Sequence, residues 1–264
     1  MADSTEQIKA PAWASFTKTH HSKPYPFISP TRPELSAAGK SVLITGGGSG
    51  IGKTVAIAFA QAGAASIAII GRRLNRLQST AAEITASSTK NAEVYFESGD
   101  IAQRSSIDAA VSAIGGKMGK IDIFVPCAGI LTRFGPLRDY DGDEFKRGLD
   151  MNVMGAFNAL QAFLPWAAPN AMVFNISSAL AHVKPNLEVV SYAVNKIAIA
   201  KMFDYLAAEN PDLHVVNIQP GVIDTEITDG YDIESQDEGT SSRLRCMPRN
   251  LKSIHLISRK AHYD

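Results

Sequence analysis

The sequence contains few cysteines and carries no net charge. The 264-residue chain contains two cysteines, Cys127 and Cys246, which cannot form a disulfide framework and therefore favour a reducing compartment. Its 26 basic residues balance its 26 acidic ones, so no overall charge draws it toward nucleic acid or an anionic membrane. We expect a cytoplasmic protein that binds neither nucleic acid nor a membrane.

Long apolar runs and targeting signals are also lacking. The stretch over residues 55–71 is rich in alanine, contains Gln61 and Gly63, and changes its hydrophobic period partway along, so a helix followed by a strand explains it better than a membrane span. The first residues do not combine a basic segment with an apolar one, and the last match no retention or peroxisomal signal. The histidines show no metal-ligand spacing, so we expect no metal.

Composition divides the chain into three parts. Residues 1–39 hold five prolines among serine, threonine and lysine, which predicts an irregular N-terminal arm. This arm either packs on the domain or on a neighbouring subunit, or it covers a substrate pocket. Residues 226–264 form a tail in which acidic charges precede basic ones. The folded core is therefore expected over residues 40–225.

Apolar segments of alternating period run through this core. Strands are predicted at residues 41–45, 66–70, 93–97, 121–125, 172–176 and 214–218, and helices at 50–61, 74–86, 106–118, 144–166 and 189–208. Strands that alternate with helices form a parallel sheet covered on both faces. We predict an α/β protein with a doubly wound parallel sheet, a Rossmann fold, whose ligand lies at the carboxyl ends of the strands. Residues 253–258 either supply a seventh strand or belong to a basic tail without one.

A glycine cluster follows the first predicted strand, over residues 45–52. Glycines let a backbone turn sharply and approach a pyrophosphate, while the start of the next helix offers unpaired N–H groups. A purely structural turn would also use glycines, but the strand before it and the helix after it favour dinucleotide binding. The residues predicted to contact the pyrophosphate are Gly46, Ser49, Gly50, Ile51 and Gly52.

The second predicted strand ends without the acidic residue that usually binds the adenosine ribose diol of NAD. Arg72 and Arg73 stand there instead, and an arginine suits the 2′-phosphate of NADP. We therefore expect NADP, with NAD as the alternative and Arg72 as the ligand, unless these arginines only begin a solvated helix. After the third strand, Asp100 is placed either to bind the adenine amino group or to cap the next helix.

Tyr192 and Lys196 lie four residues apart in the last predicted helix, and this spacing puts them on one face. A free phenol holds its proton at neutral pH, and a neighbouring ammonium favours the phenolate. The pair could therefore exchange a proton with a substrate oxygen.

With these residues the sequence resembles the short-chain dehydrogenase/reductase family over residues 40–225. The motifs that carry the resemblance, in the family's order, are Thr45-Gly-Gly-Gly-Ser-Gly-Ile-Gly52, Asn152-Val-Met-Gly155, Ile176-Ser-Ser178, Tyr192-Ala-Val-Asn-Lys196 and Pro220-Gly-Val-Ile-Asp-Thr225. The proline-rich arm is similar to arms of members from filamentous fungi, where many such reductases act in secondary metabolism.

The resemblance implies a role for each residue of the catalytic set. Tyr192 would be the general acid or base for the substrate oxygen, as hydride moves to or from the nicotinamide. Ser178, with Ser177 in reserve, would hydrogen-bond that oxygen, and Asn152 would hold a water that relays protons. Lys196 would also bind the nicotinamide ribose.

The resemblance also implies further coenzyme contacts and an assembly. Asn152 and Tyr192 would lie beside the nicotinamide end, while Ile223 and Thr225 would line it. The expected protein is an NADP-preferring oxidoreductase acting on a small carbonyl compound or its alcohol, and a homo-oligomer, either dimer or tetramer.

The sequence departs from the family pattern in two places. Cys127 stands where the family often has an asparagine, which predicts modest loosening between strands and no catalytic role for the thiol. The 39 residues of the tail, 226–264, predict a shortened substrate lid. The alternative function is therefore a dinucleotide-binding protein with weak or no catalysis.

Overall fold

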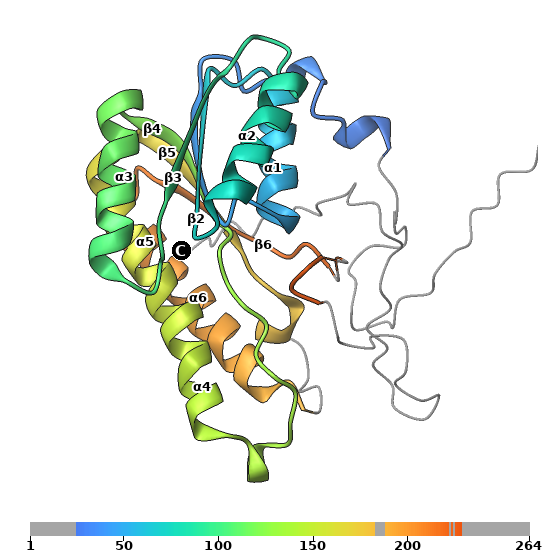
Figure 1. Cartoon of the computed structure of the whole chain (residues 1–264), viewed down its shortest axis with the longest axis vertical. Coiled ribbons are helices and arrows are strands. Elements are labelled where there is room, and N and C mark those ends of the chain that lie inside the picture. The colour runs from blue at the N-terminus through green and yellow to red at the C-terminus, as the bar shows by residue number, and fades with distance from the viewer. Residues whose placement is uncertain (1–24, 183–187, 222, 224, 229–264) are drawn as a thin grey trace, which may run out of the picture.

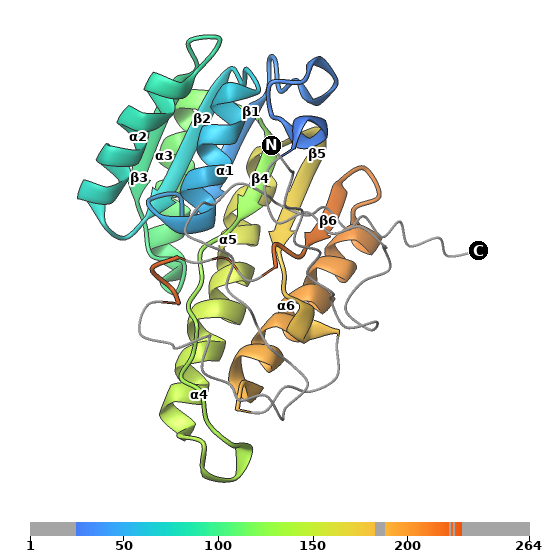
Figure 2. The same cartoon turned by 90° about the vertical axis from the view of Figure 1, so that its right-hand side faces the viewer.

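Six parallel strands form the central sheet of this protein (Figures 1 and 2). The structure is a computed structural model and describes residues 25–182, 188–221, 223 and 225–228. The strands are β1 (Ser41–Thr45), β2 (Ser66–Gly71), β3 (Glu93–Ser98), β4 (Ile121–Pro126), β5 (Ala167–Ile176) and β6 (His214–Ile218). Their order is β3-β2-β1-β4-β5-β6, so the winding reverses between β1 and β4. The predicted Rossmann fold is confirmed.

Helices cover both faces of the sheet (Figure 1). One face carries α1 (Gly50–Gln61) and α2 (Leu74–Ser87), and the other carries α3 (Arg104–Met118), α5 (Gly155–Phe163) and α6 (Val190–Glu209). The short helix α4 (Gly142–Gly148) extends beyond the sheet and leads toward α5. Each crossover returns the chain to a parallel strand, and the crossover from β3 to β4 passes over β2 and β1.

The prediction of one continuous helix over residues 144–166 is wrong, because this run is interrupted. A π-helical segment, Leu149–Met154, separates α4 from α5, and a 3₁₀ turn, Leu164–Trp166, ends the run at Pro165. Glycines flank the π-helical segment because neighbours approach closely: a Cβ would lie 2.6 Å from Asn195 Nδ2 at Gly148, and 2.6 Å from Ile101 Cδ1 at Gly155. Tertiary packing therefore decides where this helix widens, a feature that apolar spacing does not report.

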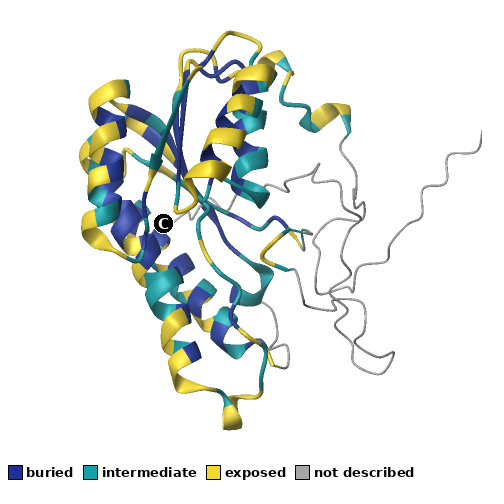
Figure 3. Ribbon diagram, in the orientation of Figure 1, coloured by how far each residue is buried: buried dark blue, intermediate teal, exposed yellow. Residues whose placement is uncertain are grey.

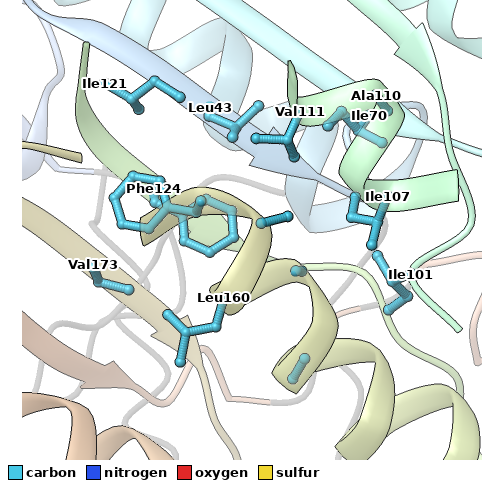
Figure 4. Close-up of a cluster of buried hydrophobic side chains, with 14 of the residues drawn as sticks. Leu43, Ile70, Ile101, Ile107, Ala110, Val111, Ile121, Phe124, Leu160 and Val173 are labelled. Carbon is cyan, nitrogen blue, oxygen red and sulfur yellow. The ribbon is translucent and has the colours of Figure 1, made fainter. Parts of the chain in front are cut away.

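Two hydrophobic cores lie on the two sides of the sheet. Along β1, Leu43 faces the core under α3, α5 and α6, while Val42 and Ile44 face the core under α1 and α2. Figure 4 shows part of the first core, including Phe124. The Phe124 ring stacks on that of Phe163, with centroids 4.6 Å apart. Burial is therefore concentrated along the strands and the inner helix faces, as Figure 3 shows.

The two ends of the chain are described only near the core. From Tyr25 the arm forms two 3₁₀ turns, Pro26–Ile28 and Pro33–Leu35, and Ala37 N–H then donates to Ala62 O at 2.9 Å. Residues 1–24 and the predicted seventh strand at 253–258 lie outside the described residues. Among the helices that the structure describes, none is both long enough and apolar enough to cross a membrane.

The burial of Leu43 predicts how its truncation changes the stability of the protein. Its side chain is fully buried, so Leu43→Ala should lower the free energy of unfolding by about 2–5 kcal/mol in a urea titration. Leu137, which is 72% exposed, supplies the matched control, and Leu137→Ala should change stability by less than about 0.5 kcal/mol. Equal losses in the two variants would contradict the described core.

Candidate active site

The glycine turn between β1 and α1 is held by close backbone contacts. Gly46 N–H and Gly47 N–H both donate to Ile70 O, at 2.8 and 3.2 Å. Gly46 has a φ of +71°, and a Cβ there would lie 2.8 Å from the Ala128 backbone. A Cβ at Gly52 would lie 2.4 Å from Gly46 O. Side chains are therefore excluded from these positions, and the turn presents its backbone.

The same turn leaves the start of α1 available to a ligand. The N-cap residue Ser49 makes no side-chain capping hydrogen bond, and Gly50 has a φ of +53°. Unpaired N–H groups at a helix N-terminus attract phosphate. A Cβ at Gly50 would meet the Thr225 methyl group at 3.4 Å, so the segment after β6 lies against the turn. The described residues fit the pyrophosphate of a dinucleotide.

Arginines follow β2, at the position predicted for the 2′-phosphate. Arg72 is exposed, and its carbonyl accepts from Ser98 Oγ at 3.4 Å. The side chain that reaches the glycine turn is that of Arg73, whose Nη2 donates to Ser49 Oγ at 3.2 Å. Arg73 also pairs with Glu226 at 3.0 Å. Arg72 as the phosphate ligand therefore stays a prediction, and Arg73 is the neighbour that contacts the glycine turn.

Asp100 closes a turn after β3. Its Oδ1 accepts from Ala102 N–H at 3.0 Å, and its own N–H donates to Ser106 Oγ at 3.0 Å. The N-cap of α3 is Gln103, so the alternative prediction of Asp100 as the cap of this helix is wrong. The Asx turn places the carboxylate at the carboxyl end of β3.

Tyr192 and Lys196 share one face of α6, as their spacing predicts. The Lys196 Nζ lies 5.5 Å from the centroid of the Tyr192 ring and donates to Ile176 O at 2.7 Å. Ile176 is the last residue of β5, directly before the two serines. One hydrogen bond thus joins the helix that carries Tyr192 to the strand end that carries Ser178.

The two serines differ in accessibility. Ser177 is 5% exposed, and its N–H donates to Ile218 O at 2.7 Å, which ties the end of β5 to β6. Ser178 is partly exposed, and its Oγ accepts from Leu180 N–H at 3.3 Å. Ser178 is therefore the serine that can meet a substrate with little rearrangement.

Asn152 lies in the π-helical segment and is 3% exposed. Its Oδ1 accepts from Ile130 N–H at 2.8 Å, and its Nδ2 donates to Ile130 O at 3.0 Å. Both polar atoms of the amide are thus engaged with the loop after β4. The side chain positions this loop, a role that the expected water relay did not include.

Cys127 occupies the start of that loop. Burial raises the pKa of its thiol to about 11, although the Lys196 charge and the Gly52 N–H act in the opposite direction. The thiol is therefore neutral at neutral pH. Thr45 Oγ1 accepts from Ala128 N–H at 3.3 Å and so links β1 to the loop that begins at Cys127.

Glu144 holds the far part of the same loop. Its carboxylate is 6% exposed, accepts from Arg133 N–H at 2.8 Å, and pairs with Arg147 at 2.6 and 2.7 Å. Chiefly through the Arg147 hydrogen bonds, the pKa of Glu144 falls to about 2. The Gly135 N–H donates to Glu188 O at 2.7 Å, so the loop is also joined to the residues before α6.

Metal ligands do not gather in this region. Within the described residues, no group of three or more histidine, cysteine, aspartate or glutamate side chains is placed to hold a metal ion. The candidate site therefore consists of the glycine turn, the arginines after β2, and the residues near Tyr192.

Comparison with known proteins gives consistent matches. A family model described as short chain dehydrogenase matches residues 40–235. The chain is 31% identical over 234 residues to short chain dehydrogenase tazN of Aspergillus terreus, covering 86% of this chain and 50% of that protein. It is 30% identical over 237 residues to short chain dehydrogenase pigC of Monascus ruber, covering 88% and 77%. The chain thus spans half the length of the first relative.

Solved structures share the fold. A short-chain type dehydrogenase/reductase from Mycobacterium ulcerans superposes with a TM-score of 0.69 at 30% identity, covering 74% of this chain and 72% of that one. A short chain dehydrogenase from Burkholderia cenocepacia in complex with NADP gives a TM-score of 0.67 at 30% identity, covering 74% and 80%.

The lowered pKa of Glu144 predicts that the stability of the protein depends on pH. Because the folded-state pKa is lowered from 4.5 to about 2, the stabilisation is complete above pH 4.5 and is lost as the pH falls toward 2. Glu144→Gln should therefore cost about 2–3 kcal/mol of unfolding free energy at pH 7 and progressively less below pH 4.5. Glu209→Gln, at an exposed position, is the matched control and should have little effect at either pH. A Glu144→Gln loss that did not depend on pH would contradict this assignment.

Proposed function

This chain belongs to the short-chain dehydrogenase/reductase family, and on that premise we propose that it is an NADP-preferring oxidoreductase. It interconverts a small carbonyl compound and the corresponding alcohol. The observation that carries the proposal is the hydrogen bond from Lys196 Nζ to Ile176 O, because it ties the helix that carries Tyr192 to the strand end that precedes Ser178.

In this proposal the chain's own residues transfer the proton and bind the substrate oxygen. The coenzyme, when bound, supplies or accepts the hydride. Tyr192 donates a proton to the carbonyl oxygen, or removes one from the alcohol, and the Lys196 ammonium favours the phenolate that results. Ser178 donates a hydrogen bond to the reacting oxygen, which stabilises charge developing there. Asn152 holds the loop after β4 through Ile130 and so keeps this side of the site in shape.

The coenzyme-binding residues form a second part of the proposal. The residues proposed to contact the dinucleotide are Gly46, Ser49, Gly50, Ile51, Gly52, Arg72, Asp100, Asn152, Tyr192, Lys196, Ile223 and Thr225. Support comes from the side-chain-free glycine turn and the uncapped start of α1. Arg72 and its neighbour Arg73 favour the 2′-phosphate of NADP, and the similar Burkholderia cenocepacia protein is in complex with NADP.

The cysteine content and the fungal relatives bear on the cellular setting of the protein. Two cysteines in 264 residues favour the cytoplasm. Fungal short chain dehydrogenases stand among the relatives, and the arm is similar to those of fungal members, which favours secondary metabolism. The substrate would then be a small metabolite with a ketone, aldehyde or secondary alcohol.

We further propose that the protein is a homo-oligomer. Val194, Ile197 and Tyr205 are exposed at helical spacing along α6, and Met154 and Phe157 are exposed on the neighbouring helical run. Exposed large apolar side chains on adjoining elements favour contact with another copy of the chain.

The catalytic proposal is tested with Tyr192→Phe. This change removes the hydroxyl and keeps the ring, so it should leave the Kd for NADPH within about twofold while lowering turnover by about 10²–10⁴-fold. Binding is measured by fluorescence titration, and turnover by NADPH oxidation against a panel of ketones and aldehydes. Tyr95→Phe on β3 is the matched control and should retain turnover. Full turnover by Tyr192→Phe would contradict the role of Tyr192, whereas a wild-type protein that binds NADPH and reduces no carbonyl would favour the binding-only alternative.

The oligomer proposal is tested by charge insertion. Ile197→Lys should shift the sedimentation coefficient from that of a dimer or tetramer to that of a monomer, because burying an unpaired ammonium in an interface is costly. Leu137→Lys, at another exposed apolar position, should leave the assembly unchanged. A monomeric wild-type protein would rule this proposal out.

A further inference from the structure

A carboxylate from the far end of the described chain bridges two arginines beside the glycine turn. Glu226 Oε2 lies 3.0 Å from Arg73 Nη2, and Glu226 Oε1 lies 3.0 Å from Arg76 Nη2. Each oxygen thus pairs with a different guanidinium. Glu226 lies 153 residues after Arg73, and residues 225–228 are the last coloured segment of the chain in Figures 1 and 2.

The position of this bridge bears on the coenzyme. Arg73 Nη2 also donates to Ser49 Oγ at 3.2 Å, so the pair lies at the junction of the glycine turn and the end of β2. In a dinucleotide fold this junction receives the adenosine ribose. No acidic residue stands directly after β2 in the sequence, yet the tertiary structure brings Glu226 there.

We infer that Glu226 is a specificity-determining residue that competes with the 2′-phosphate of NADP for Arg73 and Arg76. The inference rests on the proposed dinucleotide binding and concerns which coenzyme that site prefers. A phosphate monoester and a carboxylate both satisfy paired guanidinium groups, and the two anions cannot share them because like charges repel. NAD has a hydroxyl at this position and leaves both ion pairs intact.

Because the three side chains are exposed to solvent, the phosphate and the Glu226 carboxylate can exchange reversibly. Arg73, Arg76 and Glu226 are 54%, 50% and 39% exposed, so water and salt screen the ion pairs. Exposed pairs of this kind are individually weak. A phosphate of higher charge can therefore displace Glu226, at a cost that lowers the preference for NADP without abolishing binding.

Thr225 connects the exchange of Glu226 for phosphate to the glycine turn. Thr225 precedes Glu226, and its methyl group lies against Gly50 at the start of α1. Thr228 Oγ1 donates to Thr225 O at 2.7 Å and accepts from Thr225 N–H at 3.1 Å, so residues 225–228 form one turn. Displacing the carboxylate would therefore act on a turn that also contacts the phosphate-binding glycines.

The test compares affinities for the two coenzymes in wild type and Glu226→Gln. The glutamine keeps the shape of the side chain and removes its charge. At low salt, the Kd for NADPH should fall by about threefold to tenfold, the range that two exposed ion pairs support, and the Kd for NADH should stay within about twofold. The fragments 2′,5′-ADP and 5′-AMP provide a readout that does not involve turnover, and only the first should bind more tightly to the variant.

Asp108→Asn is the matched control. Asp108 is 41% exposed and pairs with Arg104 at 2.7 Å within α3, so its removal changes net charge equally at another place. It should leave the NADPH to NADH ratio unchanged. In an Arg76→Ala background, Glu226→Gln should have a smaller effect on the Kd for NADPH, because one of the two competing contacts is already absent.

The possible outcomes separate this inference from the proposed function. A wild-type protein that binds neither coenzyme would contradict the proposed function. A wild-type protein that binds both, with the same NADPH to NADH ratio in Glu226→Gln, would overturn the role of Glu226 alone. Weaker NADPH binding by Glu226→Gln would also overturn it, because the carboxylate would then be holding the arginines in place for the phosphate.

Discussion

The close approach of the glycine turn to the backbone after β4 is the constraint on which the rest of this site depends. Gly46 lies against Ala128 where a Cβ would come within 2.8 Å, and Gly52 lies against Gly46 O at a position where a Cβ would come within 2.4 Å. Only bare backbone fits both contacts. The contact of Gly46 with Ala128 joins the turns that follow β1 and β4, where the winding of the sheet reverses and opens a crevice beside the start of α1.

The remaining parts of the site are joined by hydrogen bonds between chain segments. Lys196 ties α6 to the end of β5, and Asn152 ties the π-helical segment to the loop after β4. Gly135 N–H ties the far part of that loop to Glu188 O, before α6. Each of these bonds ends on a backbone carbonyl or amide. The proposed catalytic side chains therefore rest on a frame that tolerates change in the surrounding side chains.

Sequence reasoning predicted the strands and most helices of this fold, because hydrophobic period and glycine positions are local properties. It predicted one helix over residues 144–166, where the structure has a π-helical interruption between glycines packed against Asn195 and Ile101. For the site it predicted Tyr192, Lys196 and the glycine turn, and the structure has the two side chains on one face of α6. It did not anticipate that both polar atoms of the Asn152 amide would be engaged with Ile130, since that contact depends on a neighbouring loop.

The sequence by itself determined the family, the order of strands and helices along the chain, and the residue types available for proton transfer. These follow from short-range pattern: a glycine turn excludes side chains, and a spacing of four places two groups on one helix face. Only the tertiary structure decided which distant groups meet. Glu226 reaches Arg73 and Arg76 because the segment after β6 returns to the glycine turn, where Thr225 lies against Gly50. No local pattern encodes a contact between residues 153 positions apart.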